Sequence, residues 1–252
     1  MINLWLQGLV DQSSQKTAAV LADAEAAGHP VSLALALTWC GCLATLCRGD
    51  IESAELSIAR LKEHTEKYGL GTYHACALGF EGELSARRGD VRTGERLLRT
   101  SLATLREARY ENLYTPFLSS LGELLMTAGR LDESLAVANE AVRRTERSHG
   151  YWWMPEALRI KGEVLLLSDQ AGITAADDLL RYSVNLAHGE AALFWELRAA
   201  TSLARLRRAQ GRISEARDLL ASVYGRFTEG FKTADLQAAR RILDELHDAA
   251  AD

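Results

Sequence analysis

The side chains that could carry out chemistry are few, and their spacing does not suit catalysis. None of the six histidines forms a His-x-x-x-His or His-Glu-x-x-His pair, the spacings that place two zinc ligands on one helical face. The sequence also contains no Gly-x-Ser-x-Gly elbow, no Gly-x-Gly-x-x-Gly loop and no Gly-x-x-x-x-Gly-Lys-Ser/Thr phosphate loop. We therefore expect no catalytic residue, no metal site and no cofactor. An enzyme whose groups are assembled from distant helices stays as a third-ranked alternative.

Four cysteines, Cys40, Cys42, Cys47 and Cys76, fall in one third of the chain and inside expected helices, whereas disulfide frameworks place cysteines in loops. On a helix, Cys40 and Cys42 would point about 200° apart, because each residue turns roughly 100°. They cannot easily share a metal ion. The sequence predicts reduced thiols that act as small core residues.

Charge and composition exclude several classes of protein. The chain has 48% apolar and 25% charged residues, which is typical of a globular protein. Twenty-nine Lys and Arg against 34 Asp and Glu give a formal net charge of -5, so no basic field favours nucleic acid. Residues 1–6 lack the basic start and cleavage site of a secretory signal, which favours the cytoplasm. The uncharged stretch 31–47 reaches the lower length limit of a membrane span, about 17 residues, but polar residues interrupt it and we expect a buried helix.

A repeat of about 40 residues organises the chain. Gly49, Gly89 and Gly129 are 40 residues apart, and each follows one helical pattern and precedes another. Gly211 lies 82 residues after Gly129, which corresponds to two repeats with a short insertion near 168–172. Each of these glycines suits the left-handed end of a helix. The repeat is therefore a helical hairpin.

Small residues recur at two further positions of the repeat. Seven residues before the turn glycine stand Gly82 and Gly122, and five residues after it stand Gly94 and Ser134. Two antiparallel helices approach closely only where side chains are short. Pro30, Pro116 and Pro155 each lie near the start of a first-arm helix, where a missing N–H costs least.

The pattern predicts one helical-repeat domain over residues 1–252. It begins with a partial repeat at 1–28, continues with hairpins near 30–68, 70–108, 111–147, 151–188 and 190–224, and ends with a capping helix near 233–248. The connector 225–232 has two phenylalanines, which we expect to dock on the last hairpin. Residues 5–10 resemble the end of a first-arm helix and its turn, so the chain starts in mid-repeat. We expect an exposed apolar face there, which implies a longer solenoid, a truncated homologue or a homodimer through exposed repeat ends.

The spacing of small residues resembles the tetratricopeptide repeat, although that repeat usually has 34 residues; HEAT-like pairing stays as an alternative. More specifically, residues 158–166, 195–206, 211–216 and 223–231 resemble the C-terminal repeat region of bacterial multidomain signalling ATPases. The resemblance implies an all-α, right-handed α-solenoid of about five hairpins. In that family the repeats follow an ATPase domain and a winged-helix or nucleotide cyclase domain. Neither is in this sequence, so the resemblance implies the sensor or interaction arm alone, and the ATPase, cyclase and DNA-binding activities do not carry over.

In a tetratricopeptide-like superhelix the first-arm helices line a concave groove, acidic in its middle here and basic at its carboxy end. This charge favours a cationic or mixed-charge peptide. The alternative is that the glutamates pair with arginines of neighbouring repeats, such as Arg159, and only align the stack. The candidate partner-binding residues are Trp39, Leu43, Glu83, Glu123, Glu163, Arg159, Arg198 and Arg205.

Aromatic residues recur near the starts of the first-arm helices. They are candidate partner contacts, since aromatics are common at binding hot spots, or else wedges between repeats. Two adjacent tryptophans cannot both point inward, so the Trp152 and Trp153 pair is the best candidate for exposure. The full set is Tyr73, Tyr114, Trp152, Trp153 and Trp195.

Two functional hypotheses follow. The first is a non-catalytic scaffold that binds a protein or peptide, such as an ATPase or regulator domain, in signalling or transcriptional control; direct contact with nucleic acid or membrane is not expected. The second is a small-molecule sensor, because aromatics beside arginines can hold a sugar or an anion.

Overall fold

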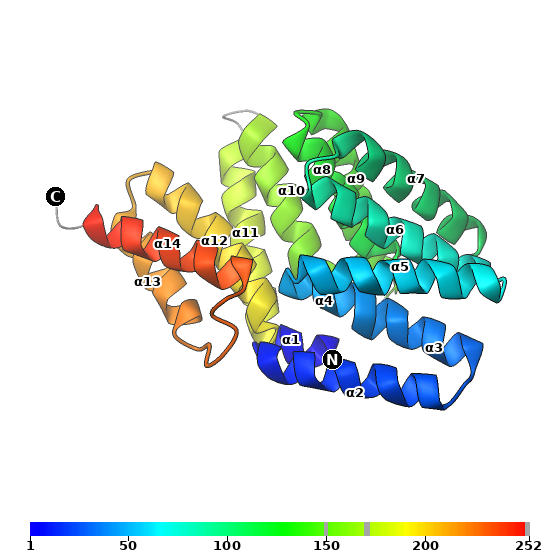
Figure 1. Cartoon of the computed structure of the whole chain (residues 1–252). Coiled ribbons are helices and arrows are strands. Elements are labelled where there is room, and N and C mark those ends of the chain that lie inside the picture. The colour runs from blue at the N-terminus through cyan, green and yellow to red at the C-terminus, as the bar shows by residue number, and fades with distance from the viewer. Residues whose placement is uncertain (149–150, 169–171, 250–252) are drawn as a thin grey trace.

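The computed structural model describes residues 1–148, 151–168 and 172–249. Within these residues, every regular element is helical, and consecutive helices pack as antiparallel hairpins (Figure 1). The predicted fold class, an all-α solenoid of tetratricopeptide-like hairpins, is confirmed.

The chain begins with α1 (Ile2–Leu6) and α2 (Val10–Ala26). The first full hairpin has a first arm made of α3 (Pro30–Ala36), η1 (Leu37–Leu43) and α4 (Ala44–Arg48), and α5 (Ile51–Lys67) as its second arm. The next two hairpins are α6 (Gly71–Arg87) with α7 (Val91–Glu107), and α8 (Tyr114–Thr127) with α9 (Leu131–Ser148). A short 3₁₀ helix, η2 (Tyr151–Trp153), leads into α10 (Met154–Ser168) and α11 (Gly172–Gly189). The last hairpin is α12 (Leu193–Ala209) with α13 (Ile213–Tyr224), followed by α14 (Ala234–Asp248).

The repeat markers have the roles that their spacing predicted. Gly49, Gly89, Gly129 and Gly211 all have a positive φ, between 74° and 86°, which only glycine adopts without strain. At the small positions, a Cβ on Gly82 would lie 2.9 Å from the backbone nitrogen of Leu98. The backbones of α6 and α7 therefore touch at Gly82 and Gly94, where no larger side chain fits.

One feature of the first arm was not predicted. Residues 37–43 form a π-helix inside an otherwise α-helical rod. Thr45 follows this stretch, and its Oγ1 donates to the carbonyl of Cys42 at 2.9 Å. Gly41 lies within it, where a Cβ would meet Cβ of Ser57 on α5 at 3.1 Å. The missing side chain of Gly41 therefore allows the two arms of this hairpin to approach closely.

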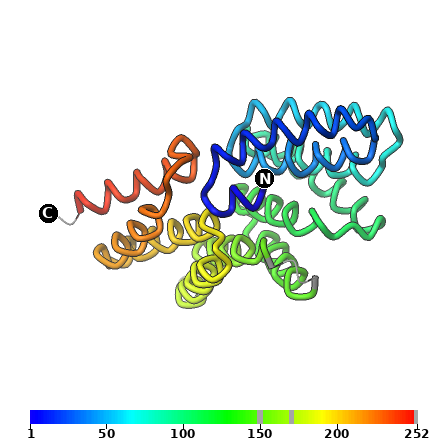
Figure 2. Tube along the Cα trace, turned by 90° about the horizontal axis from the view of Figure 1, so that it is seen from below, coloured from blue at the N-terminus to red at the C-terminus, as the bar shows by residue number. Residues whose placement is uncertain are grey.

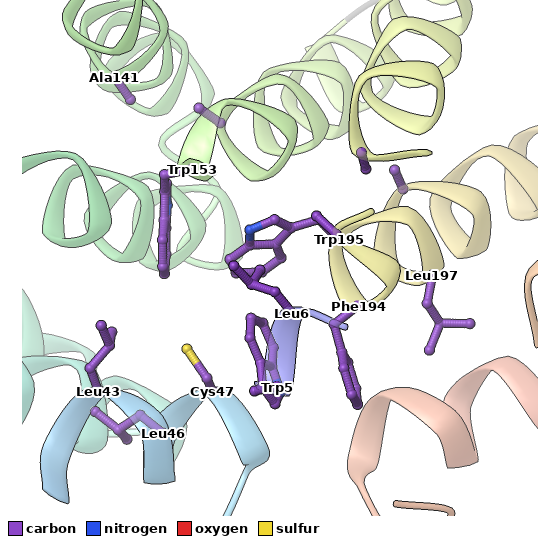
Figure 3. Packing of buried hydrophobic residues seen from close by; sticks show 14 of the residues in the cluster. Trp5, Leu6, Leu43, Leu46, Cys47, Ala141, Trp153, Phe194, Trp195 and Leu197 are labelled. Atoms are coloured by element: carbon purple, nitrogen blue, oxygen red, sulfur yellow. The ribbon is translucent and has the colours of Figure 1, made fainter. Parts of the chain in front are cut away.

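The N-terminal end does not expose an apolar face, so this expectation was wrong. Trp5 is 0% exposed, because its ring stacks on Phe194 at a centroid distance of 4.9 Å and meets Trp195 edge-on at 4.7 Å. Figure 3 shows Trp5 and Leu6 between these residues and Cys47 of the first full hairpin. The solenoid curves so far that its fifth hairpin returns to the N-terminus and covers it.

The connector 225–232 completes this closure. Phe227 is buried and packs on Phe194 at 5.1 Å, and Phe231 contacts Tyr224 of α13 at 6.1 Å between ring centroids, so both dock on the last hairpin as predicted, although Phe231 stays 47% exposed. A carboxylate oxygen of Glu229 accepts the backbone N–H of Asp11 at 2.9 Å, at the start of α2. In Figure 2 the N-terminal segment lies between the blue-green hairpins and the yellow and orange hairpins. Trp5 and Leu6 are therefore not available for a homodimer contact.

Candidate functional site

A groove runs along the inner side of the solenoid, over the first-arm helices α6, α8, α10 and α12 and up to α14. It consists of three hollows that share lining residues. The central hollow, about 310 Å³, shares Arg87 and Glu123 with the amino-side hollow, about 240 Å³. It shares Glu163, Ser202 and Arg205 with the apolar hollow, about 450 Å³. The three hollows therefore form one continuous concave surface.

The floor of the central hollow is a network of buried charges. The side chain of Arg159 is 8% exposed; its guanidinium pairs with Glu156 on one side and Glu163 on the other, each at 2.8 Å, and also with Glu123. Arg198 of α12 pairs with the same Glu156 at 2.9 Å and with Asp235 of α14 at 3.0 Å. The network thus ties α8, α10, α12 and α14 together.

Glu156 is the centre of this network, and its side chain is 3% exposed. Burial by itself would raise the pKa of Glu156, but Arg159 and Arg198 outweigh burial and lower it to about 2. Burial would lower the pKa of Arg198, yet Asp235 and Glu156 outweigh that effect and raise it. The carboxylate and the guanidinium therefore stay charged inside the protein, each stabilised by the other.

Each groove glutamate has an arginine partner, and Arg159 is shared by three carboxylates, those of Glu123, Glu156 and Glu163. Glu83 binds Arg87 at 2.6 Å and accepts the hydroxyl of Ser120 at 2.9 Å, and Arg87 also donates to the carbonyl of Leu46. Glu123 and Glu163 both bind Arg159. These ion pairs correspond to the second interpretation of the sequence, in which the glutamates pair with arginines and align the stacked repeats.

Arg205 differs from the other groove arginines. It is exposed, lies on the boundary of the central and apolar hollows, and has no hydrogen bond or ion pair to any residue that the structure describes. Its guanidinium is therefore free to bind a ligand anion.

Two other predicted groove residues lie elsewhere. Leu43 is 2% exposed and belongs to the core, as Figure 3 shows. Trp39, on η1, lies 6.3 Å from Trp152 between ring centroids. Neither lines the three hollows, which begin at α6 and include no residue of the first arm Pro30–Arg48.

The five aromatic residues near the starts of the first-arm helices fall into two groups, buried and partly exposed. Tyr114, Trp153 and Trp195 are buried, at 1%, 7% and 1% exposed, so their rings are wedges between repeats and not surface contacts. Trp195 donates its indole N–H to the carbonyl of Trp152 at 2.8 Å. Trp152 and Tyr73 are only partly buried. Of the two adjacent tryptophans, Trp153 is therefore in the core and Trp152 is partly exposed, in agreement with the prediction that the two cannot both point inward.

Sequence reasoning missed Asp235 and the side chains of the apolar hollow. Asp235 belongs to a helix outside the hairpin pattern, so its position in the groove had no periodic signal. Leu166 and Leu167 follow Glu163 by three and four residues, which places them on the same helical face one turn later. This spacing could have been used to predict that Leu166 and Leu167 line the groove next to Glu163.

The cysteines are free and buried, which agrees with reduced thiols. Burial raises the pKa of the Cys47 and Cys76 thiols to about 12, so both are protonated near neutral pH. Within the described residues, no group of three or more His, Cys, Asp or Glu side chains could hold a metal ion.

One segment, Pro30–Arg48, is long and apolar enough by composition to cross a membrane, with a mean hydropathy of 1.7. In the structure 67% of the most apolar 18-residue window of this segment is buried. The segment lies against α2, α5 and α6, as the repeat pattern predicted for a core helix.

The repeated hairpins and the concave groove between them define a tetratricopeptide-like helical-repeat protein. No family model matches the chain. An uncharacterized protein of Rhizobium meliloti (strain 1021) is 25% identical over 205 residues, which are 81% of this chain and 20% of that protein. The chain thus spans about a fifth of the length of the curated relative that it matches.

Solved structures share the fold. BtubC (BKLC) from P. vanneervenii has a TM-score of 0.58 at 12% identity, covering 96% of this chain and 91% of that one. The apo form of RapI has a TM-score of 0.57 at 14% identity, covering 96% and 72%. A putative kinesin light chain from Podosopora anserina, with nearly identical tetratricopeptide-like repeats, has a TM-score of 0.52 at 15% identity, covering 79% and 96%. At these identities the likeness concerns the fold alone.

Proposed function

We propose that this protein is a non-catalytic scaffold that binds a protein or peptide in its concave groove. The observation that carries the proposal is the continuous surface of three hollows over four consecutive first-arm helices, shaped for an extended ligand. The network of Glu156, Arg159 and Arg198 beneath it connects the helices that line the groove, and this supports a binding surface that is formed before a ligand arrives.

The resemblance of the last hairpins to repeat regions of bacterial signalling ATPases supports a finer proposal. The scaffold serves as the sensor or interaction arm of a signalling or transcription-regulating ATPase system. Its partner is an ATPase or regulator domain, and it acts in the cytoplasm without binding nucleic acid or membrane directly.

The small-molecule alternative has less support. The arginines that would hold an anion, Arg159 and Arg198, are already bound to carboxylates, and Tyr114 and Trp195 are buried. We therefore favour the scaffold.

Photo-crosslinking tests the proposal. A photoreactive amino acid is placed at Thr127 or Ala209, exposed positions of the amino-side and apolar hollows, and at Arg92, an exposed position on the second-arm helix α7. Each purified variant is irradiated in lysate of the source cells, and adducts are identified by mass spectrometry.

We expect a discrete protein adduct from Thr127 or Ala209 and none from Arg92. Adducts from Arg92 alone, or from no position, would contradict binding in the groove. A groove adduct with a protein that contains neither an ATPase nor a regulator domain would keep the scaffold and overturn the signalling assignment.

A further inference from the structure

The apolar hollow lies at the carboxy ends of the first-arm helices. Its walls come from Met126 of α8, Leu166 and Leu167 of α10, Ile173 of α11 and Leu206 of α12. Leu167 is 59% exposed, although the neighbouring Leu206 is buried. A volume of about 450 Å³ lies within the range of binding pockets, about 300–1,000 Å³. A large aliphatic side chain of a ligand would remove Leu167 from water here.

On the polar rim of this hollow, one charged side chain, Arg205, has no ion-pair partner among the described residues. Glu163 binds Arg159 at 2.8 Å, and it also accepts the hydroxyl of Ser202, so both rim groups have partners. Arg205 has none among the described residues. A ligand that enters the hollow therefore meets apolar walls and a single free positive charge.

The pairing of the groove charges refines the preference that the sequence indicated. The glutamates suggested a cationic or mixed-charge peptide, but in the structure Glu83 pairs with Arg87, and Glu123 and Glu163 pair with Arg159. At the carboxy end of the groove, the charged side chain without a partner among the described residues is Arg205, at the end that the sequence predicted to be basic.

We propose that the apolar hollow and Arg205 bind a peptide segment in which a large apolar side chain stands next to an acidic residue. The apolar side chain enters between Leu167 and Leu206, and the carboxylate pairs with the Arg205 guanidinium. The hollow shares its rim with the polar central hollow, so an extended segment continues along the groove; this continuity favours a peptide over a fatty acid. This inference rests on the proposed scaffold function and specifies its partner.

Selection from a displayed library tests it. Random 12-residue peptides are selected against the full-length wild-type protein and against Arg205→Glu and Leu167→Ser. Arg92→Glu and Leu56→Ser are matched controls on second-arm helices, since Arg92 is exposed and Leu56 is 73% exposed. Because all four positions are exposed, the variants should fold, which circular dichroism checks.

We expect the wild type to enrich peptides with Leu, Met or Phe beside Asp or Glu. The Arg205→Glu and Leu167→Ser variants should bind the best peptide roughly ten- to a hundredfold more weakly by fluorescence anisotropy, and the controls should match the wild type. Added salt should weaken wild-type binding, because the rim charge is exposed.

Three outcomes would overturn the inference. These are enrichment of basic peptides, equal binding by wild type and Arg205→Glu, and no enrichment of any peptide while laurate binds in an Arg205-dependent way. Groove adducts in the photo-crosslinking experiment would still support the scaffold in each case, so the failure of the inference and the failure of the proposed function can be told apart.

Discussion

Glu156 shows how single residues hold this solenoid together. Its carboxylate accepts from both Arg159 and Arg198 at 2.8 and 2.9 Å, and it is nearly inaccessible to water. A buried charge without partners costs several kcal/mol, so the three residues depend on one another.

The first prediction concerns the loss of this carboxylate. Glu156→Gln should lower the free energy of unfolding by about 3 kcal/mol, near the lower end of the usual cost of breaking a buried pair, because each arginine keeps another carboxylate. Urea unfolding followed by circular dichroism measures the change. The matched control is Glu81→Gln, whose partner Lys62 and whose own side chain are 31% and 34% exposed, and we expect less than about 1 kcal/mol there. Equal losses in the two variants would contradict the central role of Glu156.

The second prediction concerns pH. The pKa of Glu156 is lowered from 4.5 to about 2 in the folded protein, so the unfolded chain binds this proton more strongly. Its contribution to stability is therefore complete above about pH 4.5 and is lost as the pH falls toward about 2. Thermal unfolding of wild type and Glu156→Gln across this range should show a shallower loss for the variant. Parallel curves would show that Glu156 is not the titrating group.

At the scale of the helix pair, the room for a side chain at the same repeat position differs between hairpins. A Cβ on Gly82 would meet backbone atoms of α7, with Gly94 O at 3.0 Å, whereas a Cβ on Gly122 would lie 3.5 Å from the Ile160 side chain. In the third hairpin, Ser134 occupies the facing position and donates to the Gly122 carbonyl at 2.7 Å. The turn glycine thus has the same left-handed conformation in these hairpins, whereas the distance between the two arms differs from one hairpin to another.

The third prediction uses this pair. Gly82→Ala should destabilise the protein by about 1–3 kcal/mol, because two backbones must separate. Gly122→Ala should stabilise it by about 0.5–1 kcal/mol, because the contact is ordinary and alanine is the better helix former. The unfolding midpoints in urea measure both effects. If Gly82→Ala also raised the midpoint, the close approach of α6 and α7 would be refuted.

At the scale of the whole molecule, the solenoid is closed by contacts between its ends. Trp5 joins α1 to α12, and Arg198 lies over the rings of Trp5 and Trp195 at 5.8 and 5.1 Å. The aromatic closure is therefore in contact with the charged floor of the groove. Changes at the N-terminus should affect the groove through Arg198.

The fourth prediction tests the closure. Trp5→Ala should cost about 3–5 kcal/mol, the usual range for a buried aromatic. Tyr182→Ala, on α11 and 56% exposed, is the control and should change stability by less than about 0.5 kcal/mol. Hydrogen exchange of α12 amides should accelerate only in Trp5→Ala. Unchanged exchange in α12 would contradict the contact between the ends.

The sequence alone determined the features that depend on local spacing. Gly49 and Gly89 end helices in the left-handed conformation, Gly82 and Gly94 bring helices together, and apolar residues at helical period select the buried faces. These are short-range properties that each hairpin repeats, so their spacing along the chain was sufficient to predict the hairpins.

Only the tertiary structure decided what depends on the curvature of the stack. Small rotations between hairpins accumulate over five repeats, and no single spacing encodes their sum. That sum brings Phe194 onto Trp5 and Asp235 onto Arg198, and it buries Trp195. It also pairs the groove glutamates with arginines and leaves Arg205 without a partner among the residues that the structure describes. The charge that a ligand meets is therefore a property of the assembled groove, because pairing between repeats, and not the identity of each residue, determines which charges remain.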